Sequence, residues 1–237
     1  AKMTPDTSNI TRIAAAAIEA GATGIAAINT IKCLTHVNLE NYVPTPDIMG
    51  YSSVSGYSGK AIKPIALRFV RDIASAPGTA DVPLSGIGGI ETWEDAMEFI
   101  LLGCTNIQVA TSVMQYGNRI IDDLTSGLRH YMAKHRIERL DALVGKSLPH
   151  VVVPEQLDRT TILYPELQKE LCIGCGRCYL ACRDGGHDAI EWNKRRKPEM
   201  IPEKCVGCHL CKLVCPSGAI RERASRTPKK QCGNKER

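Results

Sequence analysis

The chain has 237 residues, of which 43% are hydrophobic and 23% are charged, and its formal net charge is +5. This length allows one large domain or two modest ones, and the composition excludes disordered and fibrous proteins. No apolar run approaches the roughly 18 residues of a membrane-spanning helix, and the N-terminus lacks the pattern of a signal peptide. We therefore expect a cytoplasmic protein with no membrane partner.

Basic residues cluster at 194–197 and again in the last residues of the chain, 229–237. Such runs are usually solvated loops or chain ends, and no aromatic residues are interleaved with them as in a surface that binds nucleic acid. We expect no nucleic-acid partner.

Residues 1–142 alternate short apolar runs with longer amphipathic segments. The first residues, Lys2-Met3-Thr4-Pro5, are typical of the end of a strand, so we expect the sequence to begin inside a domain. The pattern predicts strands at 25–28, 82–86 and 107–110, helices at 10–20, 64–74, 92–103 and 122–135, and a Gly- and Ser-rich loop at 50–59. This alternation is typical of a parallel α/β sheet. Four such units predict half of an eight-stranded barrel.

The alternation stops near residue 143, and three further segments follow. Residues 143–168 contain several prolines and no sustained period, which predicts a linker. Residues 169–225 are rich in Cys and Gly and repeat internally, which predicts a small α+β domain of the bacterial ferredoxin type. Residues 226–237 form a basic tail that we expect to be disordered.

Eight of the eleven cysteines fall into two copies of one motif, Cys-x₂-Cys-x₂-Cys-x₃-Cys. Three thiolates at two-residue gaps can hold three corners of a 4Fe–4S cubane, and the fourth ligand then comes from the other motif. The predicted ligand sets are Cys172, Cys175, Cys178 and Cys215 for one cluster, and Cys182, Cys205, Cys208 and Cys211 for the other.

Zinc is the alternative, because paired Cys-x-x-Cys motifs also build zinc sites. Four cysteines per motif, twice, with Pro216 after the last one, favour iron–sulfur clusters and the transfer of single electrons. Cys33, Cys104 and Cys232 stand alone, and we assign them no chemistry.

Glycine and hydroxyl residues follow two successive strands of the predicted sheet. In α/β barrels the functional groups lie at the carboxyl ends of the strands, and phosphate commonly binds to the last two loops. Gly86-Ile87-Gly88-Gly89 and Ala110-Thr111-Ser112 occupy these positions, where backbone N–H groups and a hydroxyl can surround an anion. They predict a cofactor that carries a phosphate. Lys2 and Asn29-Thr30, which could be plain surface groups, end earlier strands and offer a cation and amide donors to a flavin ring and a planar substrate.

These residues carry a resemblance to a known family. The run Ser-Gly-Lys-Ala-Ile-Lys-Pro-Ile-Ala-Leu at 58–67, together with Asn29-Thr30, Gly88-Gly89-Ile90, Gln108-Val109 and both cysteine motifs, resembles the C-terminal part of the dihydropyrimidine dehydrogenases. The likeness is greatest to the bacterial subunit that carries FMN and iron–sulfur clusters.

The resemblance implies FMN in a barrel like that of dihydroorotate dehydrogenase and NADH-dependent reduction of the 5,6 double bond of uracil or thymine. It also implies a hetero-oligomer, in which a partner flavoprotein subunit that binds NAD(H) and FAD supplies electrons through the two clusters to FMN.

The resemblance further implies roles for individual residues. Lys2 would lie against the flavin, and Asn29 and Thr30 would bind the pyrimidine. The other residues implied to hold FMN and its phosphate are Gly59, Ile87, Gly88, Gly89, Ala110 and Thr111. The family's Cys-Ser pair after the last strand is replaced here by Ala110-Thr111, and its proton-donating cysteine is expected upstream of Ala1, so no catalytic residue is assigned.

Two alternatives stay open at this point. A dihydroorotate dehydrogenase relative with a fused ferredoxin domain would differ in substrate, turning over orotate instead of uracil. A ferredoxin-type electron carrier without chemistry of its own would bind iron and no flavin.

Overall fold

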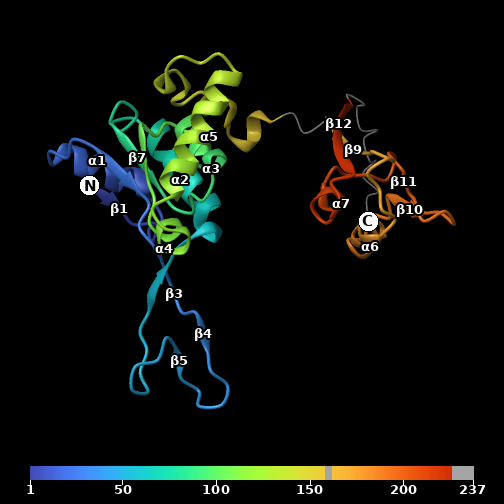
Figure 1. Cartoon of the computed structure of the whole chain (residues 1–237), viewed down its shortest axis with the longest axis horizontal. Helices are drawn as coiled ribbons and strands as arrows, with labels where there is room; N and C mark the ends of the chain where they lie inside the picture. Colours follow the sequence, from blue (N-terminus) through green and yellow to red (C-terminus); the bar gives the residue numbers. More distant parts are fainter. Residues whose placement is uncertain (158–161, 226–237) are drawn as a thin grey trace, which may run out of the picture. The chain divides into compact units, whose positions relative to one another are not determined.

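A computed structural model describes residues 1–157 and 162–225 of the chain. It separates into two compact units, Ala1–Val152 and Val153–Arg237 (Figure 1). The boundary lies inside the segment predicted as a linker, and the predicted basic tail, 226–237, lies outside the described residues. Within the described part, the helices are all too short or too polar to cross a membrane.

The first unit is built on a four-stranded sheet in the order β1-β2-β7-β8, and every neighbouring pair is parallel. The parallel α/β architecture expected from the sequence is therefore present. The strands are short, and small residues such as Ala27 and Gly86 allow helices to pack closely on one face. Their bounds are β1 (Lys2–Met3), β2 (Ile25–Ala27), β7 (Leu84–Ile87) and β8 (Asn106–Gln108).

The helices of this unit begin where the sequence supplies capping groups. The Oδ1 atom of Asn9 accepts a hydrogen bond from the N–H of Arg12 at 3.0 Å, which caps α1, and Thr92 caps α3 in a capping box with Asp95. Pro64 lies in the first turn of α2. The helix bounds are α1 (Ile10–Glu19), η1 (Lys60–Ile62), α2 (Lys63–Ser75), α3 (Trp93–Leu101), α4 (Thr111–Tyr116) and α5 (Ile120–Lys134).

The core of the first unit lies between the sheet and helices α1, α2 and α3. Its fully buried side chains include Phe99, Leu84 and Ile73, each at most 2% exposed. A second buried cluster joins α3 to Leu143, which belongs to the short helix η2 (Leu140–Leu143). The beginning of the predicted linker therefore packs against the first unit, because its apolar residues cover the outer face of α3.

An antiparallel arm lies between β2 and α2, where the sequence predicted a Gly- and Ser-rich loop over part of the segment (Figure 1). The arm leaves the sheet directly after Thr30 and returns at Ser58, so both of its ends lie at the carboxyl edge of the sheet. Large apolar side chains at its far end are exposed, including Met49 at 93% and Tyr42 at 81%. Its strands are β3 (Ile31–Cys33), β4 (His36–Val37), β5 (Pro44–Thr45) and β6 (Ser55–Tyr57).

Among its described residues, the second unit contains two small antiparallel sheets and two short helices. The strand β9 (Ile162–Leu167) pairs with β12 (Ile220–Ser225), so the end of the predicted linker belongs to this unit. The chain between the units forms the single turns η3 (Leu148–His150) and η4 (Pro154–Gln156). The remaining elements are α6 (Arg177–Asp184), β10 (Ile190–Trp192), β11 (Pro198–Met200) and α7 (Leu210–Leu213).

We predict that Phe99→Ala lowers the free energy of unfolding of the first unit by about 3 to 5 kcal/mol, because the ring is fully buried and its removal leaves a cavity. Urea unfolding, followed by the fluorescence of Trp93 in a Trp192→Phe background, measures the change. Met114→Ala is the control, since Met114 is 86% exposed and should change stability by less than about 0.5 kcal/mol. Equal effects of the two substitutions would contradict the described core.

Candidate cofactor sites

One cavity lies at the carboxyl ends of the four parallel strands, and it is the first candidate site. All nine residues of the first unit that were implied to hold a flavin, a phosphate or a planar substrate line this cavity. They are Lys2, Asn29, Thr30, Gly59, Ile87, Gly88, Gly89, Ala110 and Thr111. The sheet explains this placement, because parallel strands end at the same edge.

The loop after β7 has a backbone that suits close approach to an anion. Gly88 and Gly89 have φ angles of 132° and 71°, a region that L side chains rarely adopt. A Cβ atom at Gly89 would lie 2.8 Å from the carbonyl oxygen of Gly59, so there is no space for a side chain there. The residues present therefore fit a cofactor phosphate held by backbone N–H groups.

Polar side chains surround the rest of the cavity. The hydroxyl of Thr111 donates to Oγ of Ser58 at 3.1 Å, so in the structure it has a side-chain acceptor close by. The Oδ1 atom of Asn29 accepts the N–H of Thr30 at 3.0 Å, which leaves the amide nitrogen of Asn29 as the donor available to a bound molecule. Lys2, in the two-residue strand β1, adds a cation.

Seven further residues line the cavity without having been predicted as site residues: Ile28, Ser58, Ile62, Ile90, Gln108, Val109 and Ser112. The amide nitrogen of Gln108 donates to Oγ of Ser85 at 2.8 Å, and the Ser85 hydroxyl donates to Oδ1 of Asn106 at 2.5 Å. Asn106 and Gln108 are two positions apart on β8 and so share one face of the sheet. This alternation of polar residues in a short strand was the signal that could have revealed Gln108.

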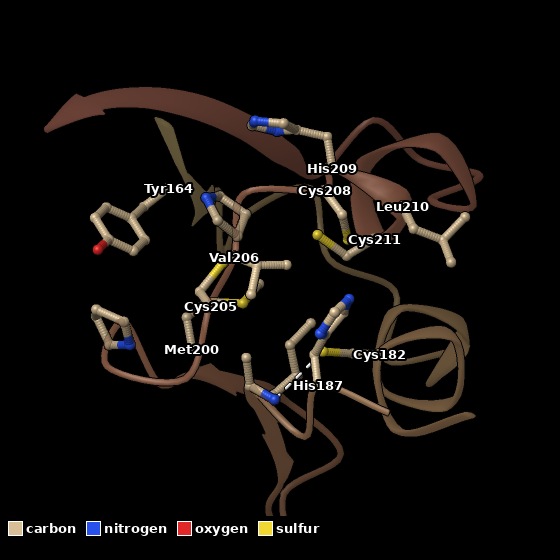
Figure 2. A pocket seen from close by; sticks show the side chains of 14 residues that line it. Tyr164, Cys182, His187, Met200, Cys205, Val206, Cys208, His209, Leu210 and Cys211 are labelled. Carbon is tan, nitrogen blue, oxygen red and sulfur yellow. Dashed lines mark hydrogen bonds between the residues drawn. The ribbon is translucent and has the colours of Figure 1, made fainter. Parts of the chain in front are cut away.

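Two cavities of the second unit are each lined by one of the predicted sets of four cysteines. Cys182, Cys205, Cys208 and Cys211 line the first, where Figure 2 shows their sulfur atoms facing the same space. Cys172, Cys175, Cys178 and Cys215 line the second. In both, three cysteines come from one motif and the fourth is the last cysteine of the other motif.

The cysteine sets fit a cluster better than a single ion. Zinc needs four ligand atoms about 2.0 to 2.3 Å from one point, whereas each set of four cysteines surrounds a space. A cubane of several irons requires such a space, so its four cysteines could each hold one corner.

Backbone N–H groups point at three of the sulfur atoms. Those of Gly207, Ala189 and Ala219 donate to Cys205, Cys182 and Cys215 at 3.4, 3.3 and 3.3 Å. Hydrogen bonds to cluster sulfurs help to set the reduction potential.

The pKa values of several cysteine thiols depart from their ordinary value. Burial raises the pKa of Cys178 and raises that of Cys211 to about 11. At Cys215, burial also acts to raise the pKa, but hydrogen bonds from Ser217 and Ala219 outweigh it and lower the pKa. The buried cysteines must therefore lose protons when they bind iron.

The two halves of the cysteine repeat have different residue types at one position but share the backbone conformation there. Gly176 begins α6 with φ of 77°, and the matching residue before α7, His209, has φ of 58°. A left-handed residue starts the helix in both motifs although only one copy has glycine, which indicates that the ligand loop requires this conformation.

The basic run at 194–197 forms the turn between β10 and β11 beside the first motif. The ammonium group of Lys197 donates to the backbone carbonyl of Cys172 at 2.7 Å. Lys197 therefore stabilises a loop that carries predicted cluster ligands. Residues 194–196 are exposed, as expected for a solvated turn.

Comparison with known families assigns each unit. Residues 1–132 match the family described as dihydroorotate dehydrogenase, and residues 166–221 match the 4Fe–4S dicluster domain.

Individual relatives agree with these matches. The NAD-dependent dihydropyrimidine dehydrogenase subunit PreA of Escherichia coli (strain K12) is 52% identical over 197 residues, which are 83% of this chain and 48% of that protein. The catalytic subunit of dihydroorotate dehydrogenase B (NAD(+)) of Pyrococcus furiosus is 40% identical over 145 residues, 61% of this chain and 46% of that protein. The chain thus spans about half the length of these curated relatives.

We predict that Cys215→Ala removes about four of eight iron atoms per chain in anaerobically prepared protein, because Cys215 lines the cavity of Cys172, Cys175 and Cys178 and completes that cluster. Iron and acid-labile sulfide measure the loss, and electron paramagnetic resonance shows which cluster persists. Cys33→Ser is the control and should keep all the iron. Selective loss of the cluster bound by Cys205, Cys208 and Cys211 would contradict the crossed ligand sets.

Proposed function

The chain belongs to the dihydroorotate dehydrogenase family, whose match covers residues 1–132, and we propose that it is the FMN and iron–sulfur part of a cytoplasmic dihydropyrimidine dehydrogenase. The reaction is the NADH-dependent reduction of uracil or thymine to the 5,6-dihydropyrimidine. In this proposal the four parallel strands form half of an eight-stranded barrel, and a flavoprotein partner subunit that binds NAD(H) and FAD supplies the electrons.

One observation carries the proposal: nine strand-end residues suited to a flavin, its phosphate and a planar base line a single cavity, in a chain that also has a dicluster domain. The 52% identity to the PreA subunit extends over 197 residues. That alignment is longer than the whole first unit, Ala1–Val152, so it must continue into the second.

Two cofactors are implied by the two domains. FMN supplies hydride transfer to a carbon–carbon double bond, and 4Fe–4S clusters supply single-electron transfer. The thiolate ligands and the lone cysteines fit a reducing compartment.

The chain's own residues have separable tasks in this proposal. The backbone N–H groups of Gly88 and Gly89 hold the cofactor phosphate, and the hydroxyl of Thr111 adds a donor once it turns from Ser58. The ammonium group of Lys2 stabilises negative charge that develops on the ring system during reduction. The amide nitrogen of Asn29 and the hydroxyl of Thr30 hydrogen-bond the edge of the pyrimidine, which presents both donors and acceptors.

The two sets of cysteines complete the proposed path for electrons. Each cavity lies within the second unit, and Cys178 and Cys211 are buried while Cys175 and Cys208 are exposed. Electrons from the partner would reach the clusters at such exposed edges and pass from the clusters to FMN.

A dihydroorotate dehydrogenase activity is the second candidate, because the family match and the relative from Pyrococcus furiosus carry that name. The observation against it is the extent of that alignment, which covers 145 residues and is shorter than the first unit. The alignment with PreA is longer, at 197 residues or 83% of this chain, against 61% here.

We predict that the full-length protein, supplied anaerobically with reduced methyl viologen, oxidises the dye in the presence of uracil or thymine and forms the 5,6-dihydropyrimidine. Turnover with orotate should be at least about tenfold slower, because its extra carboxylate needs a partner that a site for uracil lacks. Dye absorbance and chromatography of the product measure both reactions. Faster turnover of orotate would favour the second candidate, and bound iron without bound flavin would indicate an electron carrier.

We also predict that Thr111→Val weakens FMN binding in the full-length protein by roughly 1 to 3 kcal/mol, because it keeps the side-chain volume and removes a donor to a charged phosphate. Retention of FMN through dialysis and the dissociation constant from fluorescence titration measure the effect. Thr105→Val, on the loop before β8, is the control. Unchanged FMN affinity in Thr111→Val would place the phosphate elsewhere.

A further inference from the structure

Two segments of the cavity wall that are far apart in sequence pack directly against each other. One is the start of α2, with Gly59 before it, and the other is the loop that carries Gly88 and Gly89 after β7. A Cβ atom at Gly89 would lie 2.9 Å from Cβ of Lys63 and 2.8 Å from the carbonyl oxygen of Gly59. The spacing of these segments therefore fixes the width of the phosphate cradle.

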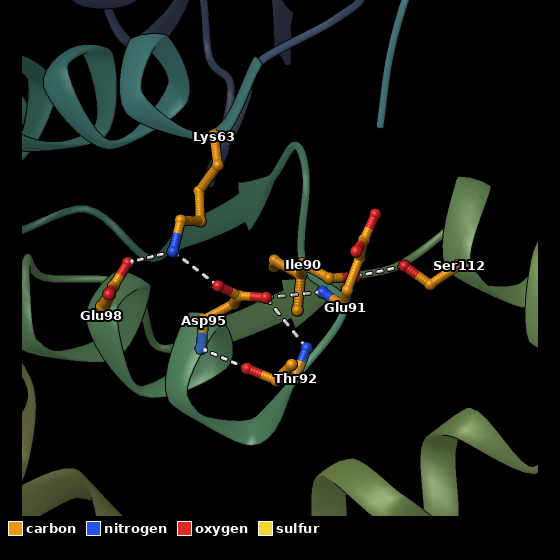
Figure 3. Close-up of polar contacts among 7 residues, drawn as sticks. All are labelled: Lys63, Ile90, Glu91, Thr92, Asp95, Glu98 and Ser112. Atoms are coloured by element: carbon orange, nitrogen blue, oxygen red, sulfur yellow. Dashed lines mark hydrogen bonds and ion pairs between the residues drawn. The ribbon is translucent and has the colours of Figure 1, made fainter. Parts of the chain in front are cut away.

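A buried carboxylate ties the two segments together (Figure 3). Asp95, in the first turn of α3, accepts the backbone N–H groups of Glu91 and Thr92, both at 2.9 Å. Its other oxygen accepts from the ammonium group of Lys63 at 2.5 Å. The Asp95 side chain is 9% exposed and that of Lys63 is 20% exposed, so this ion pair is largely shielded from water.

The charges of this pair are stabilised by each other. Burial acts to raise the pKa of Asp95, but hydrogen bonds from Lys63, Glu91 and Thr92 outweigh it and lower the pKa. Burial likewise acts to lower the pKa of Lys63, but Asp95 and Glu98 raise it. Both groups are therefore charged at neutral pH, and the bridge is present under working conditions.

These contacts exceed what a helix cap needs. In a capping box the acidic side chain accepts only the N–H of the residue at the helix start, which here is Thr92. Asp95 also holds Glu91 inside the loop and Lys63 on another helix. From the far side of the loop, the buried hydroxyl of Ser112 donates to the carbonyl oxygen of Ile90. The loop after β7 is thus fixed from α2, α3 and α4.

The cation of this network is turned away from the cavity. Lys63 does not line the cavity, and its ammonium group also pairs with Glu98 at 2.8 Å. A lysine beside a phosphate site would ordinarily be assigned to the phosphate, but this one already faces two carboxylates.

We propose that Lys63 and Asp95 are positioning residues that set the distance between the Gly59 segment and the Gly88–Gly89 loop, and so preorganise the backbone donors for the FMN phosphate. The inference rests on the proposed flavin site. Both residues should therefore affect binding of the phosphate group of FMN and not binding of its ring system. Donors that are already in place bind the phosphate more tightly because they need no rearrangement.

The experiment compares FMN with riboflavin, which has the same ring system without the phosphate. Dissociation constants of both flavins are measured by quenching of flavin fluorescence in full-length apoflavoprotein that keeps its clusters. Asp95→Asn should weaken FMN about tenfold and change riboflavin less than twofold. Glu98→Gln is the matched control, since it removes a carboxylate from Lys63 without touching the loop, and it should leave both constants within about twofold.

Lys63→Met tests the same bridge while leaving the cap of α3 intact, so the proposal can still be tested if Asp95→Asn fails to fold. The double variant should bind FMN no more weakly than the weaker single variant, because both substitutions break one interaction. The inference would be overturned if a variant lost affinity for FMN and for riboflavin equally. It would also be overturned if the wild type binds FMN and both variants keep the wild-type ratio of the two dissociation constants. A wild-type protein that holds its clusters but binds no FMN would overturn the proposed function as well.

Discussion

The parallel register of β1, β2, β7 and β8 is the constraint on which the first unit depends. Because all four strands run in one direction, their carboxyl ends meet at one edge, and the residues that follow them are brought together without being close in sequence. Lys2 and Thr111, more than a hundred positions apart, border the same cavity for this reason. Because each strand is short, the residues at its carboxyl end follow closely after side chains that are buried in the core.

Both units present backbone N–H groups as fixed donors that suit a negatively charged group. In the first unit the left-handed Gly89 belongs to a loop suited to a phosphate, and in the second the N–H of Gly207 points at the sulfur of Cys205. A backbone donor held by a rigid loop costs little entropy to align and leaves no side chain to rearrange. The exchange of Cys182 and Cys215 between the two halves then makes each cluster cavity depend on both motifs.

Sequence reasoning located features that follow from a period or a fixed spacing. Strand ends such as Asn29 and Gly88 were predictable because the alternation of strand and helix determines which residues share an edge. The repeat of the motif likewise predicted that Cys215 lies with the cysteines of the first motif, whose cavity it lines. The arm between β2 and α2 escaped prediction, since its strands are two or three residues long and its apolar side chains are exposed instead of alternating. The contact of Lys63 with Asp95 escaped because it joins residues 32 positions apart through side-chain reach.

The same contact explains how a phosphate site can adjoin a cation without using it. A free ammonium group beside the cavity would attract any anion over several ångströms, with little discrimination of shape. Pairing Lys63 with Asp95 and Glu98 cancels most of that field, so at the loop after β7 the attraction comes from N–H groups whose directions the backbone fixes, while Lys2 is the lysine that lines the cavity. Recognition then depends on where the oxygens of the bound group lie, which is a stricter requirement than charge. In this proposal the lysine contributes to selectivity by holding the wall of the cavity in place.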